Sequence, residues 1–157
     1  QSYSLYVDKL EDWFNDNVSP EWNDMRSKAM IILQEEAELD EIVRLVGIDA
    51  LSWKDRLTME VARSVREDYL HQNAFDEVDT YTSPEKQFMM LNLILQFYDK
   101  ARQALDGGAN LSEVINLPVR DSIGRSKYIP ESEKQRFAEI ENELNGQMAA
   151  LGGKGGL

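Results

Sequence analysis

The sequence predicts an all-α fold, a bundle of about six helices with a long helical hairpin. Apolar residues recur at three- and four-residue spacings over most of the chain, which is the period of an amphipathic helix. The tripeptide Ser-Pro-Glu occurs at residues 19–21 and again at 83–85, and serine at the N-cap before proline at the first helical position is typical of a helix start. No alternating run of apolar and polar residues is long enough to indicate a strand, so helices must form the core.

The first third of the chain predicts two helices. Residues 4–17 form a short amphipathic helix whose apolar stripe is Leu5, Tyr6, Leu10, Trp13 and Phe14. The first Ser-Pro-Glu start then opens a second helix, which we expect to reach Val46, with the stripe Trp22, Met25, Ala29, Ile32 and Leu33. Gly47 follows, where a left-handed residue commonly ends a helix.

A tight turn at residues 47–51 is expected to join this helix to an antiparallel partner. Ser52, with Asp55 three residues later, resembles a capping box in which Asp replaces the usual Glu. The apolar positions continue to about Leu70, where His-Gln-Asn breaks the pattern. The sequence therefore predicts a helical hairpin, followed by a gap that is not helical.

The second Ser-Pro-Glu start opens a helix that Gly107 and Gly108 should end. We then expect a short helix near residues 111–116, a stop at Pro118, a further turn or two to Lys127, and a last helix opened by Pro130. Residues 1–150 thus form one domain, and the glycine-rich residues 151–157 form a flexible tail.

Composition excludes several classes of protein. Seventeen basic against twenty-nine acidic residues give a net charge of -12, which opposes binding to nucleic acid or to an anionic lipid surface. Cysteine is absent, so there is neither a disulfide framework nor a thiolate metal site. The longest apolar run, residues 88–97, is far shorter than the roughly 20 residues that cross a bilayer.

The sequence offers no catalytic residue and no metal site. Its nearest approach to a phosphate-binding loop, residues 152–155, lacks the Ser or Thr hydroxyl, a preceding strand and a following helix. The single histidine, His71, cannot supply the paired ligands of a di-metal carboxylate bundle, and it is interpreted as a solvated residue near a helix end. The acidic residues 35–41 are spaced around a helix and are interpreted as a solvated face.

Two connections carry apolar residues that need an explanation. At the hairpin tip, Leu51 and Trp53 either contact another protein or fold back on the hairpin. In the gap at residues 72–81, Phe75 and Tyr81 either plug the core between helices or offer rings on which a planar group stacks. For this second connection, the physical argument alone favours core packing.

Together these blocks resemble one family. Residues 47–57, residues 61–63 and residues 72–87, which read Gln-Asn-Ala-Phe-Asp-Glu-Val-Asp-Thr-Tyr-Thr-Ser-Pro-Glu-Lys-Gln, strongly resemble the C-terminal helical domain of the catalytic A subunit of archaeal and vacuolar-type rotary ATPases. The archaeal form is the closer match. The likeness extends to residues 19–22, 117–120 and 127–130, and it covers about residues 4–140.

The resemblance implies that the chain is a fragment of a larger subunit, whose phosphate loop and magnesium site lie upstream. The intact subunit would bind ATP or ADP with Mg²⁺ and couple ATP synthesis or hydrolysis to proton or sodium transport. The fragment alone is expected to hold no cofactor and to be inactive. Its expected partners are the upstream nucleotide-binding domain, neighbouring B subunits in an alternating ring and the central rotor, at the cytoplasmic face of the membrane.

The resemblance also implies roles for particular residues. The adenine-contacting aromatics would be Phe75 and Tyr81, and the surrounding wall would be Gln72, Asn73, Ala74 and Val78. The rotor-contacting loop would be the hairpin tip, formed by Asp49, Ala50, Leu51, Ser52, Trp53, Lys54 and Asp55. Related F-type catalytic subunits carry more acidic residues at this tip, so an explanation of torque that depends on those charges should not be transferred to this chain.

A rival interpretation comes from a different class of protein. The chain would be a free-standing helical interaction domain that docks through the hairpin tip or through the gap at residues 72–81. An initiator Met encoded immediately upstream of Gln1 would favour this adaptor, whereas an upstream phosphate loop would favour the rotary subunit.

Overall fold

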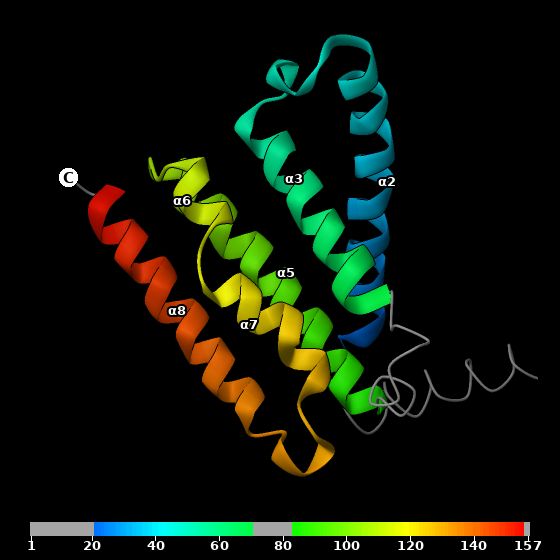
Figure 1. The fold of residues 1–157 in the computed structure, drawn as a ribbon, viewed down its shortest axis with the longest axis vertical. Coiled ribbons are helices and arrows are strands. Elements are labelled where there is room, and N and C mark those ends of the chain that lie inside the picture. The colour runs from blue at the N-terminus through cyan, green and yellow to red at the C-terminus, as the bar shows by residue number, and fades with distance from the viewer. Residues whose placement is uncertain (1–20, 71–82, 156–157) are drawn as a thin grey trace, which may run out of the picture.

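The computed structural model describes residues 21–70 and 83–155, with side chains as far as Leu151, and shows six α-helices and no strand in these residues (Figure 1). This confirms the all-α prediction. The predicted helix at residues 4–17 and the first Ser-Pro start lie outside the described residues. The α-helices are α2 (Trp22–Val46), α3 (Trp53–Ser64), α5 (Pro84–Asp106), α6 (Leu111–Ile115), α7 (Val119–Arg125) and α8 (Arg136–Gly155).

Helices α2 and α3 form the predicted antiparallel hairpin (Figure 1). The turn holds a 3-10 helix, η1 (Ile48–Ala50), and Ser52 caps α3 by accepting a hydrogen bond from the Asp55 amide at 3.2 Å. Gly47 ends α2 with φ +90° and ψ 164°. This φ is positive, as predicted, but the ψ is extended rather than left-handed helical, a combination open almost only to glycine.

The end of the hairpin differs from the prediction of continuous α-helix to Leu70. After Ser64 the backbone forms a π-helix, η2 (Val65–Leu70), in which Val65 is buried. A π-helix is rare, and π-turns are frequent at functional sites. Apolar spacing does not reveal it, because one extra residue per turn changes hydrogen bonding without removing the apolar face.

Helix α5 is the central element, packed against the hairpin on one side and α8 on the other (Figure 1). Its predicted start is confirmed: Pro84 occupies the first turn, and the Ser83 hydroxyl accepts a hydrogen bond from the Lys86 amide at 3.1 Å. The residues that α5 buries are Lys86, Met90, Leu91, Leu93, Ile94, Leu95, Phe97, Ala101 and Leu105. All of them except Lys86 belong to a single apolar core, of which α5 is the middle.

The C-terminal segment returns along α5. After α7 come two 3-10 helices, η3 (Ser126–Tyr128) and η4 (Glu131–Glu133), so the residues after Pro130 form a 3-10 turn and α8 begins only at Arg136. Helix α8 buries Phe137, Ile140, Leu144, Met148 and Leu151 against the core. It extends to Gly155, into the residues that the sequence assigned to a tail.

Candidate functional site

The predicted adenine-contacting residues, from Gln72 to Tyr81, lie outside the described residues. Their two borders are described. The segment leaves from the π-helix η2 and returns at Ser83, the cap of α5. Both borders lie at the end of the hairpin opposite its tip (Figure 1). At 1.5 Å per residue, the 25-residue α2 separates these ends by roughly 38 Å.

The hairpin tip presents only part of the surface that the sequence predicts. Leu51 is buried at 6% exposure, and Trp53 is half-buried against the core. The Lys54 ammonium lies 5.1 Å from the centre of the Trp53 ring and 3.5 Å from the Asp106 carboxylate on α5. Leu51 and Trp53 therefore largely fold back on the domain, the second of the two alternatives left open by the sequence.

The remaining tip residues are polar or small. Asp49, Ala50, Ser52 and Lys54 are exposed, and Asp55 is half-buried. The Asp49 carboxylate forms an ion pair with Arg56 at 3.2 Å, although Asp49 stays almost fully exposed. This ion pair joins η1 to the first turn of α3.

Another apolar set is exposed at the tip, and the sequence analysis missed it. Ile42, Leu45 and Val46 at the end of α2 and Ile48 in η1 are 42, 80, 66 and 49% exposed. Two of them could have been found by extending the buried stripe of α2 in steps of four and three to residues 36, 39, 43 and 46, because Ile42 and Leu45 fall off that stripe. Val46 lies on the stripe and is nevertheless exposed. We call these four residues the tip patch. Clustered exposed apolar residues indicate a contact surface.

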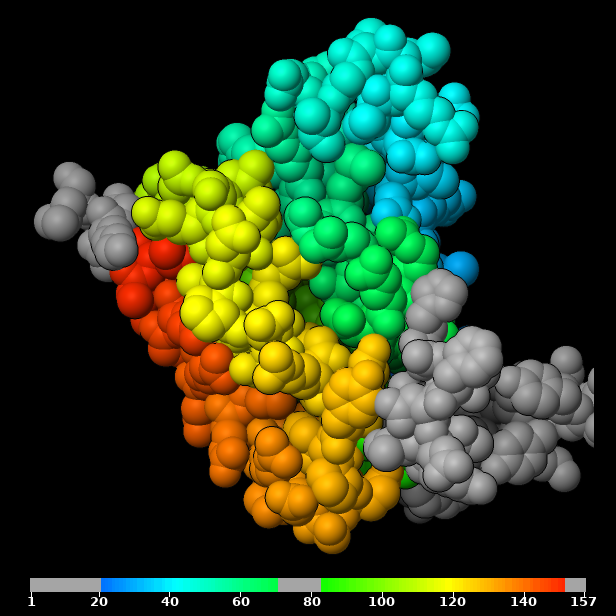
Figure 2. All heavy atoms as spheres, viewed as in Figure 1, coloured from blue at the N-terminus to red at the C-terminus, as the bar shows by residue number. Residues whose placement is uncertain are grey.

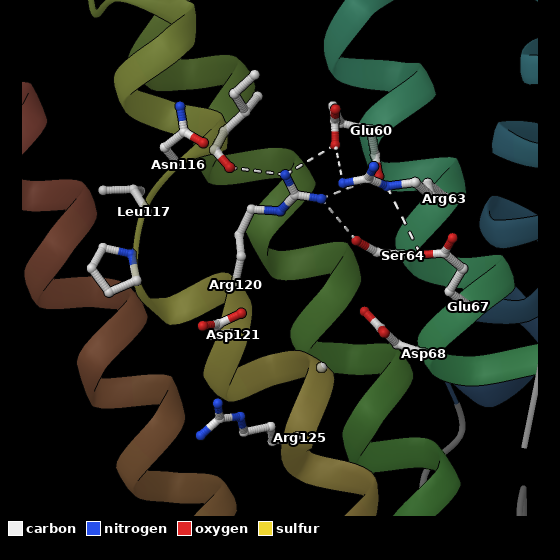
Figure 3. A pocket seen from close by; sticks show the side chains of 13 residues that line it. Glu60, Arg63, Ser64, Glu67, Asp68, Asn116, Leu117, Arg120, Asp121 and Arg125 are labelled. Atoms are coloured by element: carbon white, nitrogen blue, oxygen red, sulfur yellow. Dashed lines mark hydrogen bonds and ion pairs between the residues drawn. The ribbon is translucent and has the colours of Figure 1, made fainter. Parts of the chain in front are cut away.

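A polar groove of about 510 Å³ lies between α3 with η2 and α6 with α7. Figure 2 shows the surface hollowed between the green and the yellow parts of the chain, and Figure 3 shows the side chains. The charged residues that line it are Glu60, Arg63, Glu67, Asp68, Arg120, Asp121 and Arg125. Sequence reasoning did not predict this groove, because its two walls are about 50 residues apart along the chain.

Arg120 organises the upper part of the groove (Figure 3). Its guanidinium donates to the Glu60 carboxylate at 3.1 Å, the Ser64 hydroxyl at 3.1 Å and the Ile115 carbonyl at 2.9 Å. It also lies 5.6 Å from the centre of the Phe97 ring on α5. One planar cation thus joins α3, α5, α6 and α7.

Asp68 lies lower in the groove, on η2 (Figure 3). Burial raises the pKa of its carboxyl, while the charges of Lys127 and Arg120 act in the opposite direction. No hydrogen bond or ion pair joins this carboxylate to another residue of the described part of the chain. It faces Gly124, where an added Cβ would lie 3.4 Å from an Asp68 oxygen. The groove therefore holds a partly desolvated acid at one border of the predicted adenine segment.

The described helices provide neither a cluster of metal ligands nor a membrane span. Residues 21–70 and 83–155 contain no group of three or more His, Cys, Asp or Glu side chains placed to hold a metal ion. None of their helices is both long and apolar enough to cross a membrane.

Comparison with known proteins gives a consistent result. Residues 11–115 match the family model described as the C-terminal domain of V and A type ATP synthase. The chain is 60% identical over 152 residues to the V-type ATP synthase alpha chain of Acetivibrio thermocellus, covering 96% of this chain and 26% of that protein. It is 56% identical over 156 residues to V-type ATP synthase alpha chain 1 of Clostridium tetani, covering 99% of this chain and 26% of that protein.

The chain thus spans about a quarter of the length of these relatives. The family match covers the hairpin, α5 and the segment between them, and the relatives extend the likeness through α7 and α8. The fold agrees with the helical domain that the resemblance implies. The chain therefore belongs to the family of C-terminal domains of V- and A-type ATP synthases.

Proposed function

We propose that this chain is the C-terminal part of the catalytic subunit of a rotary ATP synthase or ATPase and links nucleotide binding to the rotor. Residues 72–81 supply the adenine side of the nucleotide pocket, with Phe75 and Tyr81 as stacking rings. Phosphate and Mg²⁺ are held by the upstream nucleotide-binding domain. The intact complex works at the cytoplasmic face of the membrane, with B subunits as neighbours, and couples ATP chemistry to ion transport.

The observation that supports the proposal is that the borders of the predicted adenine segment and an exposed apolar patch lie at opposite ends of one hairpin. The borders of the adenine segment lie at one end, and the tip patch lies at the other (Figure 1). Both helices of the hairpin pack against α5, and near the tip Lys54 lies 3.5 Å from Asp106 of α5. A small rotation at the nucleotide end therefore becomes a displacement at the tip.

The energetics limit what residues 72–81 can do. Stacking on an aromatic ring contributes about 0.5 to 1.5 kcal/mol beyond burial. That is enough to position the base and to bias closure, but millimolar binding already requires about 4 kcal/mol. Nucleotide affinity must therefore come mainly from phosphate contacts upstream, and differential contact with bound and empty states drives the domain movement.

The pocket assignment is tested by Phe75→Ala in the intact complex. We expect weaker binding of ATP and ADP by about two- to tenfold, the range that corresponds to one aromatic contact, with unchanged inhibition by inorganic tripolyphosphate. Nucleotide affinity equal to that of the wild type would refute the assignment.

The rotor contact is tested at the tip patch, because Leu51 is buried and its replacement would disturb the fold. We expect the double substitution Leu45→Ser and Val46→Ser to lower turnover or coupling without lowering the melting temperature. Met30→Ser is the matched control, since Met30 is 63% exposed on the same helix but far from the tip. Equal effects of the two variants on turnover would contradict the proposal.

A further inference from the structure

The two borders of residues 71–82 lie against one short stretch of the chain, residues 124–131. At the first border, Asp68 of η2 faces the Gly124 backbone of α7. At the second border, Ser83 contacts Glu131 of η4, and the buried Lys86 donates from Nζ to the carbonyl of Lys127. This stretch lies beyond residue 115, where the match to the family model ends.

The start of α5 lacks half of a capping box within its own sequence. Ser83 is the N-cap and accepts from the Lys86 amide at 3.1 Å. In a complete box, the residue at the position of Lys86 is Glu or Gln, and its side chain reaches back to the N-cap amide. Lysine has no acceptor, so the Ser83 amide needs a partner from elsewhere.

Glu131 supplies the missing half from 48 residues away. One carboxylate oxygen accepts from the Ser83 amide at 3.1 Å, and the other accepts from the Ser83 hydroxyl at 2.9 Å. The Ser83 hydroxyl thus accepts from Lys86 and donates to Glu131, which fixes its rotamer. The carboxylate also lies at a helix N-terminus, where the helix dipole favours negative charge.

Lys134 supports this arrangement. Its ammonium lies 2.8 Å from the Glu85 carboxylate in the first turn of α5 and 3.9 Å from the Glu131 carboxylate. Single exposed ion pairs contribute little to stability. Here the contacts converge on one helix start, where the predicted adenine segment rejoins the fold.

We propose that Glu131 is a positioning residue that completes the cap of α5 and thereby sets where the adenine-contacting segment enters that helix. This inference rests on the proposed function of residues 72–81. Glu131 does not touch the nucleotide itself. It acts through Ser83, so its loss alters the placement of the adenine side of the pocket and leaves the phosphate side unchanged.

The test compares Glu131→Ala with Glu131→Gln and Glu133→Ala in the intact complex. Glu133 is the matched control, because it lies in the same 3-10 helix and, among the residues that the structure describes, its carboxylate forms an ion pair only with Arg136, at 3.7 Å. We expect Glu131→Ala to raise the KM for Mg-ATP about two- to tenfold, with inhibition by Mg-tripolyphosphate unchanged. In Glu131→Gln the single amide oxygen still accepts from the Ser83 amide, and the side-chain NH2 can donate to the Ser83 hydroxyl oxygen in place of the bond it loses, so this variant should have a KM close to that of the wild type. Glu133→Ala should not alter the KM.

A second measurement follows the cap directly. Amide hydrogen exchange at residues 83–87 should be faster in Glu131→Ala than in Glu133→Ala. An unchanged KM for Glu131→Ala, together with a raised KM for Phe75→Ala, would overturn the positioning role and leave the pocket assignment standing. Equal weakening of Mg-ATP and Mg-tripolyphosphate would indicate general destabilisation and would also overturn it. A Phe75→Ala variant with wild-type KM would refute the pocket assignment itself.

Discussion

Replacing Arg120 by alanine should destabilise the domain by about 3 kcal/mol. An exposed ion pair contributes about 0–1 kcal/mol, and breaking a buried one costs about 3–5 kcal/mol. The Arg120 and Glu60 side chains are 16 and 27% exposed, between these limits. The substitution also removes the donor to the Ile115 carbonyl and the contact with the Phe97 ring, which is worth about 0.5–2 kcal/mol.

The assay is urea and thermal unfolding of the 157-residue chain, followed by circular dichroism. For a domain of this size, about 3 kcal/mol corresponds to a decrease in Tm of roughly 6–12 °C. Arg120→Lys keeps the charge but loses the planar fork, so it should fall between wild type and alanine. Arg125→Ala is the control: this exposed arginine lines the same groove and should change stability by less than about 0.5 kcal/mol.

A double-mutant cycle with Glu60→Ala isolates the pair. If the pair contributes as the geometry indicates, the coupling energy should exceed about 0.5 kcal/mol. A loss below about 1 kcal/mol for Arg120→Ala, or a loss equal to that of Arg125→Ala, would refute the assignment of Arg120 as the residue that joins the four helices.

Two further predictions concern glycine and acid stability. Gly47→Ala should lower the free energy of unfolding by about 1–3 kcal/mol, because φ +90° strains any side chain there although the space is open. Gly146→Ala should raise it by about 0.5–1 kcal/mol, because Gly146 lies in the exposed interior of α8, where alanine favours the helix more than glycine does. Denaturant titration of both variants checks the contrast. Burial raises the pKa of the Asp68 carboxyl in the folded state above its ordinary value of 3.8. The folded state therefore binds the carboxyl proton more tightly than the unfolded state does, and the contribution of Asp68 to stability falls as the pH rises from 3.8 through the folded-state pKa. Asp68→Asn should therefore be more stable than wild type at pH 7, and the difference should vanish below pH 3.8; equal stability at both pH values would contradict this sign.

Local sequence signals predicted those helix boundaries that are set by a capping residue. Ser52 and Ser83 hydrogen-bond the third residue after them, and Gly47 has a positive φ, because these contacts involve only neighbouring residues. The start of α8 was predicted too early. Pro130 opens a 3-10 turn, and nothing in the local pattern distinguishes such a turn from the first turn of an α-helix.

The candidate sites were less predictable, because they depend on contacts between distant residues. Arg120 meets Glu60 across 60 residues, and Glu131 meets Ser83 across 48. No periodicity links such positions. The π-helix at Val65–Leu70 was likewise missed, since its apolar residues are also compatible with an α-helix.

The chemistry of the hairpin tip bears on how a rotor contact would work. Two of the three charged tip residues already have partners within the domain: Asp49 pairs with Arg56, and Lys54 pairs with Asp106. The exposed surface beside them is the tip patch, which is apolar. An apolar contact is non-directional and is affected little by salt screening, whereas interactions between exposed charges are largely screened beyond a Debye length of about 8 Å. A contact made by the tip patch would therefore let the rotor surface slide through successive positions, with force transmitted by the shape and stiffness of the hairpin rather than by attraction between charges.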